Sequence, residues 1–296
     1  MKYIGRWLVF IGAMLLVAFL YWYGQHQSFL KQQLLESINS VKSKVVLEEI
    51  PGPKNLSAQA VFLKDLTDDK IVYEQSSDLH FYPASLSKLM SALIILENYP
   101  DLEAEIKISQ KAISIEGDAG NLKVGETFTV RDLLKMALIM SSNDAVYALA
   151  ESIGINKFVG LMNQKAQELN LSNTGFFDPT GLDEKSNFST AQDLANLAKY
   201  ILKWHPLVSD ITLQKSVKIY SLNTKAEHII ITTDELLEKI PNIVLAKTGY
   251  TVNANECFLI IYNLEGHDYV SVVLDSNDRF GDTLKLYRWL KNLLKE

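Results

Sequence analysis

The feature that most constrains the fold is the position of the β-rich runs, which lie at both ends of the globular part with a long helical block between them. Runs rich in Val, Ile, Phe and Tyr indicate strands, whereas apolar residues repeating every three or four positions indicate helices. The later β-rich runs follow one another through short connections, which predicts an antiparallel sheet and not alternating βαβ units. The expected strands are 58–66, 70–75, 243–248, 256–263 and 268–274, and the expected helices are 130–139, 144–152, 156–169, 190–203 and 282–294. The sequence therefore predicts an α+β fold.

The segment after Pro83 predicts a helix at the centre of the domain. Its sequence, SLSKLMSALIILENYP, is apolar on nearly every side, as is typical of a helix buried on all faces. Two other helix starts carry capping-box patterns, Thr129 with Asp132 and Ser189 with Gln192. The middle of the chain should thus form a mostly helical subdomain against the sheet.

Residues 7–23 (WLVFIGAMLLVAFLYWY) contain no charged side chain and predict a membrane-spanning helix. Lys2 and Arg6 precede this run, which favours a cytoplasmic N-terminus. A cleaved signal peptide is the alternative, but the end of the run lacks the small residues of a cleavage site. We expect a cytoplasmic tip and signal anchor in 1–24, a stalk in 25–56 and an extracytoplasmic globular domain in 57–296.

The composition excludes several kinds of partner. The chain has 29 Lys and Arg against 35 Asp and Glu, a net charge of −6, so it lacks the basic surface on which nucleic-acid binding depends. Its single cysteine, Cys257, lies in an apolar run and predicts a buried structural thiol. The five histidines are too scattered for a metal-ligand motif. We therefore expect neither nucleic acid nor a metal or other cofactor.

Three short strings could carry chemistry: residues 85–88 (SLSK), 141–143 (SSN) and 247–249 (KTG). Ser85 begins the buried helix, so Ser85 and Lys88 lie on one face about one turn apart. A serine attacks an acyl carbon only when a base removes its proton, and the sequence places no His/Asp pair to do so. A lysine can substitute if burial and a second cation disfavour its charged form, and Lys247 is the candidate second cation.

The other two strings have structural alternatives. Ser141 and Asn143 interrupt an apolar helical run, where they could relay a proton and orient a substrate, or form a turn in which Asn143 or Asp144 caps the next helix. The 247–249 string ends a strand, and its glycine would let a ligand backbone lie against the strand edge, or would simply precede a turn.

Together and in this order, the three strings resemble the active-site set of the penicillin-recognising serine enzymes. The surrounding sequence is similar to that of the D-alanyl-D-alanine carboxypeptidases among the low-molecular-weight penicillin-binding proteins. The stretches that carry the resemblance are YPASLSKLMSALI, LKVGETFTVRDLLKMALIMSSNDA, ELNLSNTGFFDPTGLDEKSNFSTAQDLA and LAKTGYTVNANECFLI. The resemblance implies the fold shared by D,D-peptidases and β-lactamases for 57–296.

The resemblance also assigns roles to individual residues. It implies that Ser85 is the acylated nucleophile and Lys88 its base, that Ser141 and Asn143 relay a proton and orient the substrate, and that the backbone N–H groups of Ser85 and Tyr250 hold the oxyanion. The implied substrate-binding residues are Lys247, Thr248, Gly249, Tyr250 and Arg279. Arg279 would face the terminal carboxylate of the substrate, or else be a surface arginine near a helix start.

The function implied is that of a membrane-anchored D,D-carboxypeptidase that removes the terminal D-Ala from peptidoglycan stem peptides and that penicillins acylate. A D,D-endopeptidase would use the same residues. A β-lactamase of class A would need a Glu-x-x-Leu-Asn string, which does not occur between Ser141 and Lys247, and a non-catalytic peptidoglycan-binding protein would not need the full set of side chains. Two stretches depart from the family pattern: 114–126, which lacks bulky residues, and 231–238 (ITTDELLE), which is Asn-rich in relatives.

Overall fold

The structure is a computed structural model that describes residues 52–117, 120–182 and 187–295, with a few residues between 22 and 33. The chain divides into two compact units, Met1–Pro51 and Gly52–Glu296, and the second contains the sheet and the helical block. Most of the expected anchor and stalk lies outside the described residues, so both stay predictions. Within the described part of the chain, we find no helix with the length and apolar character required to cross a bilayer.

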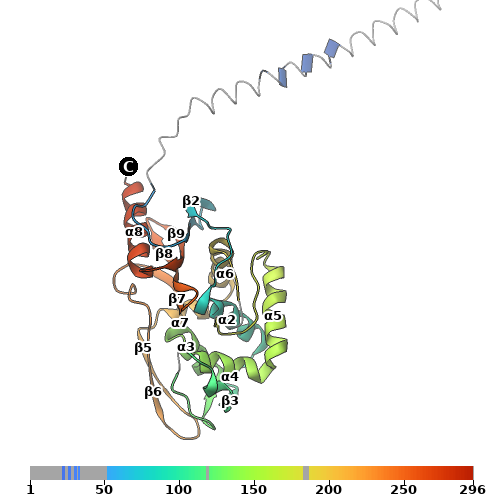
Figure 1. Cartoon of the computed structure of the whole chain (residues 1–296), viewed down its shortest axis with the longest axis vertical. Coiled ribbons are helices and arrows are strands. Elements are labelled where there is room, and N and C mark those ends of the chain that lie inside the picture. The colour runs from blue at the N-terminus through green and yellow to red at the C-terminus, as the bar shows by residue number, and fades with distance from the viewer. Residues whose placement is uncertain are drawn as a thin grey trace, which may run out of the picture. The chain divides into compact units, whose positions relative to one another are not determined.

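A five-stranded antiparallel sheet forms the framework, in the order β2-β1-β9-β8-β7 (Figure 1). Its strands are β1 (Ala60–Asp65), β2 (Lys70–Gln75), β7 (Ile243–Thr251), β8 (Asn255–Leu264) and β9 (His267–Ser276). The predicted strands and hairpins are confirmed. Strand β7 continues three residues beyond its expected end, because Gly249, Tyr250 and Thr251 all pair with β8.

The helical block follows the prediction closely. The predicted helices are α2 (Ser87–Asn98), α3 (Val130–Ile139), α4 (Asn143–Ile153), α5 (Ile155–Glu168) and α6 (Ala191–Trp204). A further short helix, α7 (Pro206–Thr212), was not predicted. Thr129 caps α3 as expected, by accepting a hydrogen bond from the Asp132 amide at 3.0 Å. The expected cap of α6 is wrong: Thr190, and not Ser189, accepts from the amide of Asp193 at 3.0 Å.

Several short elements were not predicted. They are the 3₁₀ turns η1 (Ala84–Leu86) and η2 (Ala112–Ser114), the two-stranded sheet of β3 (Glu105–Lys107) with β4 (Thr127–Thr129), and the hairpin of β5 (Ser216–Tyr220) with β6 (Glu227–Ile231). The last helix, α8 (Arg279–Leu293), begins before its expected start at 282, since the Asp278 side chain caps it by accepting from the Gly281 amide at 2.8 Å.

The sheet is covered on both faces. One face packs with the helical block in the main apolar core, and the other packs against α8 through Leu63, Ile260, Tyr262 and Leu290 (Figure 1). Residues 257–262 of β8 are therefore buried without interruption, although antiparallel strands often alternate between buried and exposed positions. This packing places η1 beside β7, and the candidate site lies where the two meet.

Candidate active site

Ser85 and Lys88 form a directly hydrogen-bonded pair. Ser85 lies in η1 and Lys88 in the first turn of α2, and Lys88 Nζ donates to Ser85 Oγ at 2.7 Å. Lys88 Nζ also donates to the backbone carbonyl of Thr180 at 3.0 Å. The lysine is 0% exposed and the serine 7% exposed. Removal from water disfavours an ammonium ion, so the geometry suits a lysine that accepts a proton from the serine.

The backbone around Ser85 is confined by two glycines from distant segments. A Cβ on Gly181 would lie 1.9 Å from the carbonyl oxygen of Ala84, and a Cβ on Gly249 would lie 3.1 Å from the amide nitrogen of Ser85. Ala84 itself has φ of 48°, a conformation that L-residues adopt at a cost. Close packing on both sides therefore fixes the direction in which the serine hydroxyl points.

The 141–143 string supplies two further polar groups. Ser141 lies in the turn between α3 and α4, and its Oγ accepts from Lys247 Nζ at 2.9 Å. Asn143 donates from Nδ2 to the Glu116 carbonyl at 2.7 Å, whereas its buried Oδ1 has no hydrogen-bond partner among the described residues. Ser142 caps α4, so the structural alternative proposed for Asn143 or Asp144 is wrong. Asn143 consequently presents an unused acceptor beside the cavity.

The 247–249 string lies on the edge strand β7 and faces η1. Lys247 is 2% exposed and donates to Ser141 Oγ and, at 2.9 Å, to the carbonyl of Thr248. The hydroxyl of Thr248 contacts that of Thr233 at 2.5 Å. Gly249 permits the close approach of η1 described above. The three strings therefore meet across the junction between the helical block and the sheet.

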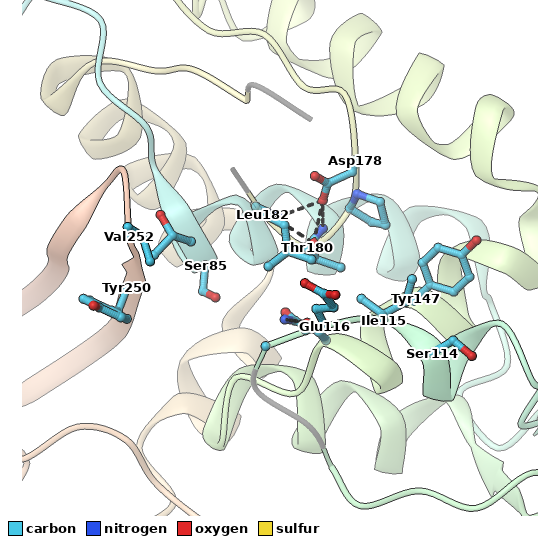
Figure 2. Close-up of a pocket in the computed structure, with 15 residues that line it drawn as sticks. Ser85, Ser114, Ile115, Glu116, Tyr147, Asp178, Thr180, Leu182, Tyr250 and Val252 are labelled. Atoms are coloured by element: carbon cyan, nitrogen blue, oxygen red, sulfur yellow. Dashed lines mark hydrogen bonds between the residues drawn. The ribbon is translucent and has the colours of Figure 1, made fainter. Parts of the chain in front are cut away.

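A cavity of about 690 Å³ opens in front of Ser85 (Figure 2). In Figure 2, Tyr250 and Val252 lie on one side of Ser85, and Glu116 and Thr180 lie on the other. Tyr250 is 58% exposed and forms part of the rim. The lining residues are Ser85, Ser114–Gly117, Asn143, Tyr147, Asp178–Leu182 and Tyr250–Val252. This space can admit an extended peptide beside the strand edge.

Arg279 reaches the same strand from the start of α8. Its Nη1 donates to the Gly249 carbonyl at 2.8 Å, and its backbone amide donates to Glu256 Oε2 at 2.9 Å. The Nε atom is buried and has no hydrogen-bond partner in the part of the chain that the structure describes. Arg279 does not line the cavity itself. The structure thus places it beside the last residues of β7, and its role toward a ligand stays a prediction.

Sequence reasoning did not identify the loop that supports Lys88. The Asp178 carboxylate accepts from the amides of Thr180 and Gly181 and from the Thr180 hydroxyl, the last at 2.7 Å, and it thereby holds the Thr180 carbonyl toward the lysine (Figure 2). The sequence Asp-Pro-Thr-Gly is typical of a turn. It does not indicate where in the molecule that turn lies.

Sequence reasoning also did not identify Asp234, which lies in the turn before β7. Burial raises the pKa of this carboxyl to about 6, although a hydrogen bond from the Leu236 amide and the charges of Arg279 and Lys247 act in the opposite direction. The sequence of residues 231–238 (ITTDELLE) showed only that this stretch departs from the family pattern, and it did not predict a role for Asp234.

Among the described residues, one group of side chains has the spacing for a metal ion: Asp65, Asp68 and His267. These groups already bind one another and the nearby backbone. Asp65 Oδ2 contacts His267 Nδ1 at 2.8 Å, and Oδ1 accepts from the amides of Thr67 and Asp68. The hydrogen bond with Asp65 raises the pKa of His267. None of the three lines the cavity, so the group lies outside the site around Ser85.

Known proteins share this sequence pattern and fold. The model of the D-alanyl-D-alanine carboxypeptidase family, peptidase family S11, matches residues 47–278. The chain belongs to this family. It is accordingly a serine-type D,D-peptidase, a hydrolase, and the resemblance found in the sequence is confirmed.

Individual relatives of this D,D-peptidase carry two activities in their names. The carboxypeptidase DacF of Bacillus subtilis is 34% identical over 206 residues, which are 68% of this chain and 52% of that protein. A D-alanyl-D-alanine endopeptidase of Pseudomonas aeruginosa is 32% identical over 254 residues, 82% of this chain and 80% of that protein. The chain therefore spans about half the length of the first relative and about four fifths of the second.

A solved structure supports the fold. The crystal structure of a D-alanyl-D-alanine carboxypeptidase from Mycobacterium tuberculosis is similar with a TM-score of 0.74 and 29% identity, over 81% of this chain and 92% of that one. The predicted α+β fold of the D,D-peptidases is confirmed.

Proposed function

We propose that this D,D-peptidase is a membrane-anchored carboxypeptidase that removes the terminal D-Ala from peptidoglycan stem peptides through an acyl-enzyme on Ser85. The hydrogen bond of 2.7 Å between Lys88 Nζ and Ser85 Oγ, inside a cavity wide enough for a peptide, is the observation that carries the proposal. The family match supports the substrate class.

In the first half-reaction, neutral Lys88 takes the proton of Ser85 while Oγ attacks the carbonyl carbon between the two D-Ala residues. The backbone N–H groups of Ser85 and Tyr250 stabilise the resulting oxyanion. When the C–N bond breaks, the proton passes to the leaving amine, and free D-Ala departs. Lys247 and Ser141, which share a hydrogen bond of 2.9 Å, provide a route for this proton and a positive charge near the site.

In the second half-reaction, water attacks the ester carbonyl of the acyl-enzyme. Lys88, neutral again, accepts a proton from this water, and Ser85 Oγ leaves and regains a proton. The unused Oδ1 acceptor of Asn143 orients the amide N–H of the bound peptide through both steps. A β-lactam follows the same first step but leaves a slowly hydrolysed ester, which accounts for the expected inhibition by penicillins.

The second candidate is a D,D-endopeptidase that cleaves cross-links between stem peptides. One observation favours this candidate: the chain covers 80% of the Pseudomonas endopeptidase but only 52% of DacF. The same residues would act, with a side-chain amine of a second stem as the leaving group in place of D-Ala. The two candidates therefore differ in substrate and not in mechanism.

Labelling with a fluorescent penicillin tests the acyl-enzyme. We expect the wild type and Ser87→Ala to be labelled and Ser85→Ala to remain unlabelled, because Ser87 is a buried neighbouring serine outside the proposed machinery. Labelling of Ser85→Ala would contradict the proposal. Product analysis with a stem pentapeptide and with a cross-linked dimer then separates the carboxypeptidase from the endopeptidase.

Membrane anchoring rests on the uncharged run 7–23. We expect the full chain in the membrane fraction of cells and a chain without residues 1–24 in the soluble fraction. Recovery of both chains in the same fraction would contradict the anchor.

A further inference from the structure

A buried carboxylate lies behind the strand edge of the site. Asp234 is only 8% exposed, in a turn between β6 and β7. Its Oδ1 accepts from the Leu236 amide at 2.7 Å, while the buried Oδ2 has no hydrogen-bond partner within the described ranges 52–117, 120–182 and 187–295. The proposed mechanism makes no use of this group. A buried carboxylate oxygen without a hydrogen bond is costly, so a compensating interaction is expected nearby.

The compensating charges belong to the substrate-binding side of the site. Arg279 from α8 and Lys247 from β7 are the cations that act on the Asp234 carboxylate, and exposed Glu235 of the same turn opposes them. Among the described residues, Arg279 Nε is likewise buried without a hydrogen-bond partner. Asp234 is thus coupled to the two cations through charge.

The turn that carries Asp234 is held firmly against the site. The hydroxyl of the preceding residue, Thr233, contacts Thr248, and its amide donates to the carbonyl of Ile139 at 3.2 Å. The Asp234 amide donates to Thr232 Oγ1 at 3.1 Å. Contacts on both sides keep the carboxylate from moving away from the two cations.

We propose that Asp234 is a positioning residue that, when ionised, offsets the charge of Arg279 and Lys247 and so weakens the hold of the site on the free terminal carboxylate of a peptide. The inference rests on the proposed function and on the expectation that Arg279 faces that carboxylate, with Lys247 adding positive charge near it. Two carboxylates near the same cations compete, and loss of charge on one strengthens the attraction for the other. Asp234 thus sets how strongly the enzyme prefers a peptide with a free terminal carboxylate over a peptide without one.

The competition depends on pH. With a pKa of about 6, Asp234 is mostly neutral at pH 5 and mostly ionised at pH 7.5. A peptide with a free carboxylate should consequently bind less tightly as the pH rises through 6, whereas the same peptide with a C-terminal carboxamide should show no such change. The ratio of the two KM values isolates Asp234, because the pH dependence of the acylation chemistry affects both peptides alike.

The experiment measures kcat and KM for an N-acylated peptide ending in D-Ala-D-Ala and for its carboxamide, from pH 5 to 8, with wild type, Asp234→Asn and Glu235→Gln. We expect Asp234→Asn to lower KM for the free acid about fivefold at pH 7.5, with kcat and the carboxamide KM changed less than about twofold. Glu235→Gln removes the same charge one residue further along, at an exposed position where water and salt screen it, and should change the KM for the free acid less than about twofold.

Three results would overturn the inference: equal changes of KM for both peptides, a higher KM for the free acid in Asp234→Asn, or a wild-type KM ratio that does not change between pH 5 and 7.5. The last result needs no variant and so holds even if Asp234→Asn fails to fold. Failure of the proposed function is distinguishable, because the wild type would then neither bind penicillin covalently nor cleave either peptide.

Discussion

The two sides of the cavity hold their lysines in different surroundings. On the side that we call the nucleophile wall (residues 84, 85, 88 and 178–182), Lys88 donates to a hydroxyl and to a backbone carbonyl. On the side that we call the strand wall (residues 232–234, 247–252 and 279), Lys247 also donates to a hydroxyl and a carbonyl, but the carboxylate of Asp234 acts on it as well. The difference suggests a division that we propose: the nucleophile wall activates Ser85, and the strand wall recognises the charge of the substrate in addition to its part in the proton route.

The largest effect is expected from the nucleophile wall. Lys88→Met keeps the length of the side chain and removes its basicity, so the acylation rate with a fluorescent penicillin should fall about a thousandfold. Lys199→Met, which alters a lysine on the surface of α6, should be acylated at the wild-type rate. A Lys88→Met enzyme with more than about a tenth of the normal rate would show that another group removes the proton.

A substitution of Gly181, in the same wall, should reduce the acylation rate almost as much. Gly181→Ala forces a Cβ against the Ala84 carbonyl and displaces the serine, which should reduce acylation about a hundredfold. Gly266 also has a positive φ, 86° against 91° for Gly181, but a Cβ there meets no atom within 4 Å. Gly266→Ala therefore bears the backbone cost alone and should keep its activity. Equal losses in both variants would mean that the backbone conformation, and not the clash, is responsible.

The strand wall should affect binding more than chemistry. Arg279→Ala should raise KM for a peptide with a free terminal carboxylate about twentyfold, since a charge-assisted hydrogen bond is lost, and should change kcat little. The carboxamide peptide and the Arg288→Ala variant, which alters an exposed arginine of α8, are the controls. If kcat falls while KM stays constant, Arg279 belongs functionally to the nucleophile wall and the division between the walls is wrong.

The smallest expected effect is on stability. Folding raises the pKa of Asp234 from 3.8 to about 6, so the folded state holds a proton that the unfolded state releases, and stability falls as the pH rises through this interval. Asp234→Asn removes this cost but buries an amide, and it should stabilise the protein by about 1 kcal/mol at pH 7.5 and not below pH 4. Thermal unfolding at both pH values measures the difference, and a stabilisation that does not depend on pH would contradict it.

The parts that could be predicted from sequence are those fixed by local spacing. Ser85 and Lys88 meet because residues three apart share a helix face, and the sheet follows from β-rich runs joined by short turns. The capping error shows the limit of local patterns. Ser189 and Thr190 both precede a suitable partner by three residues, but the Ser189 backbone pairs with Phe81, which leaves Thr190 to cap the helix.

The groups that could not be predicted are joined only by the tertiary fold. The Thr180 carbonyl reaches Lys88 across 92 positions of sequence. Asp234 is buried because its turn packs between the end of α3 and β7, which neither its own sequence nor its neighbours indicate. Burial decides the charge of a carboxyl group more than its local sequence does. Each wall therefore contains a group that local sequence could not place, Thr180 in the nucleophile wall and Asp234 in the strand wall.

The placement of Ser85 on the junction between the helical block and the sheet has a consequence for biogenesis. A chain in which only one of these halves has folded contains every reactive side chain but not their arrangement around Ser85. In such a chain Gly249 of β7 does not yet pack against η1. We expect such a chain to be unreactive, because Ser85 then lacks the packing that fixes its hydroxyl. Covalent labelling by penicillin should therefore report only molecules in which both halves have joined.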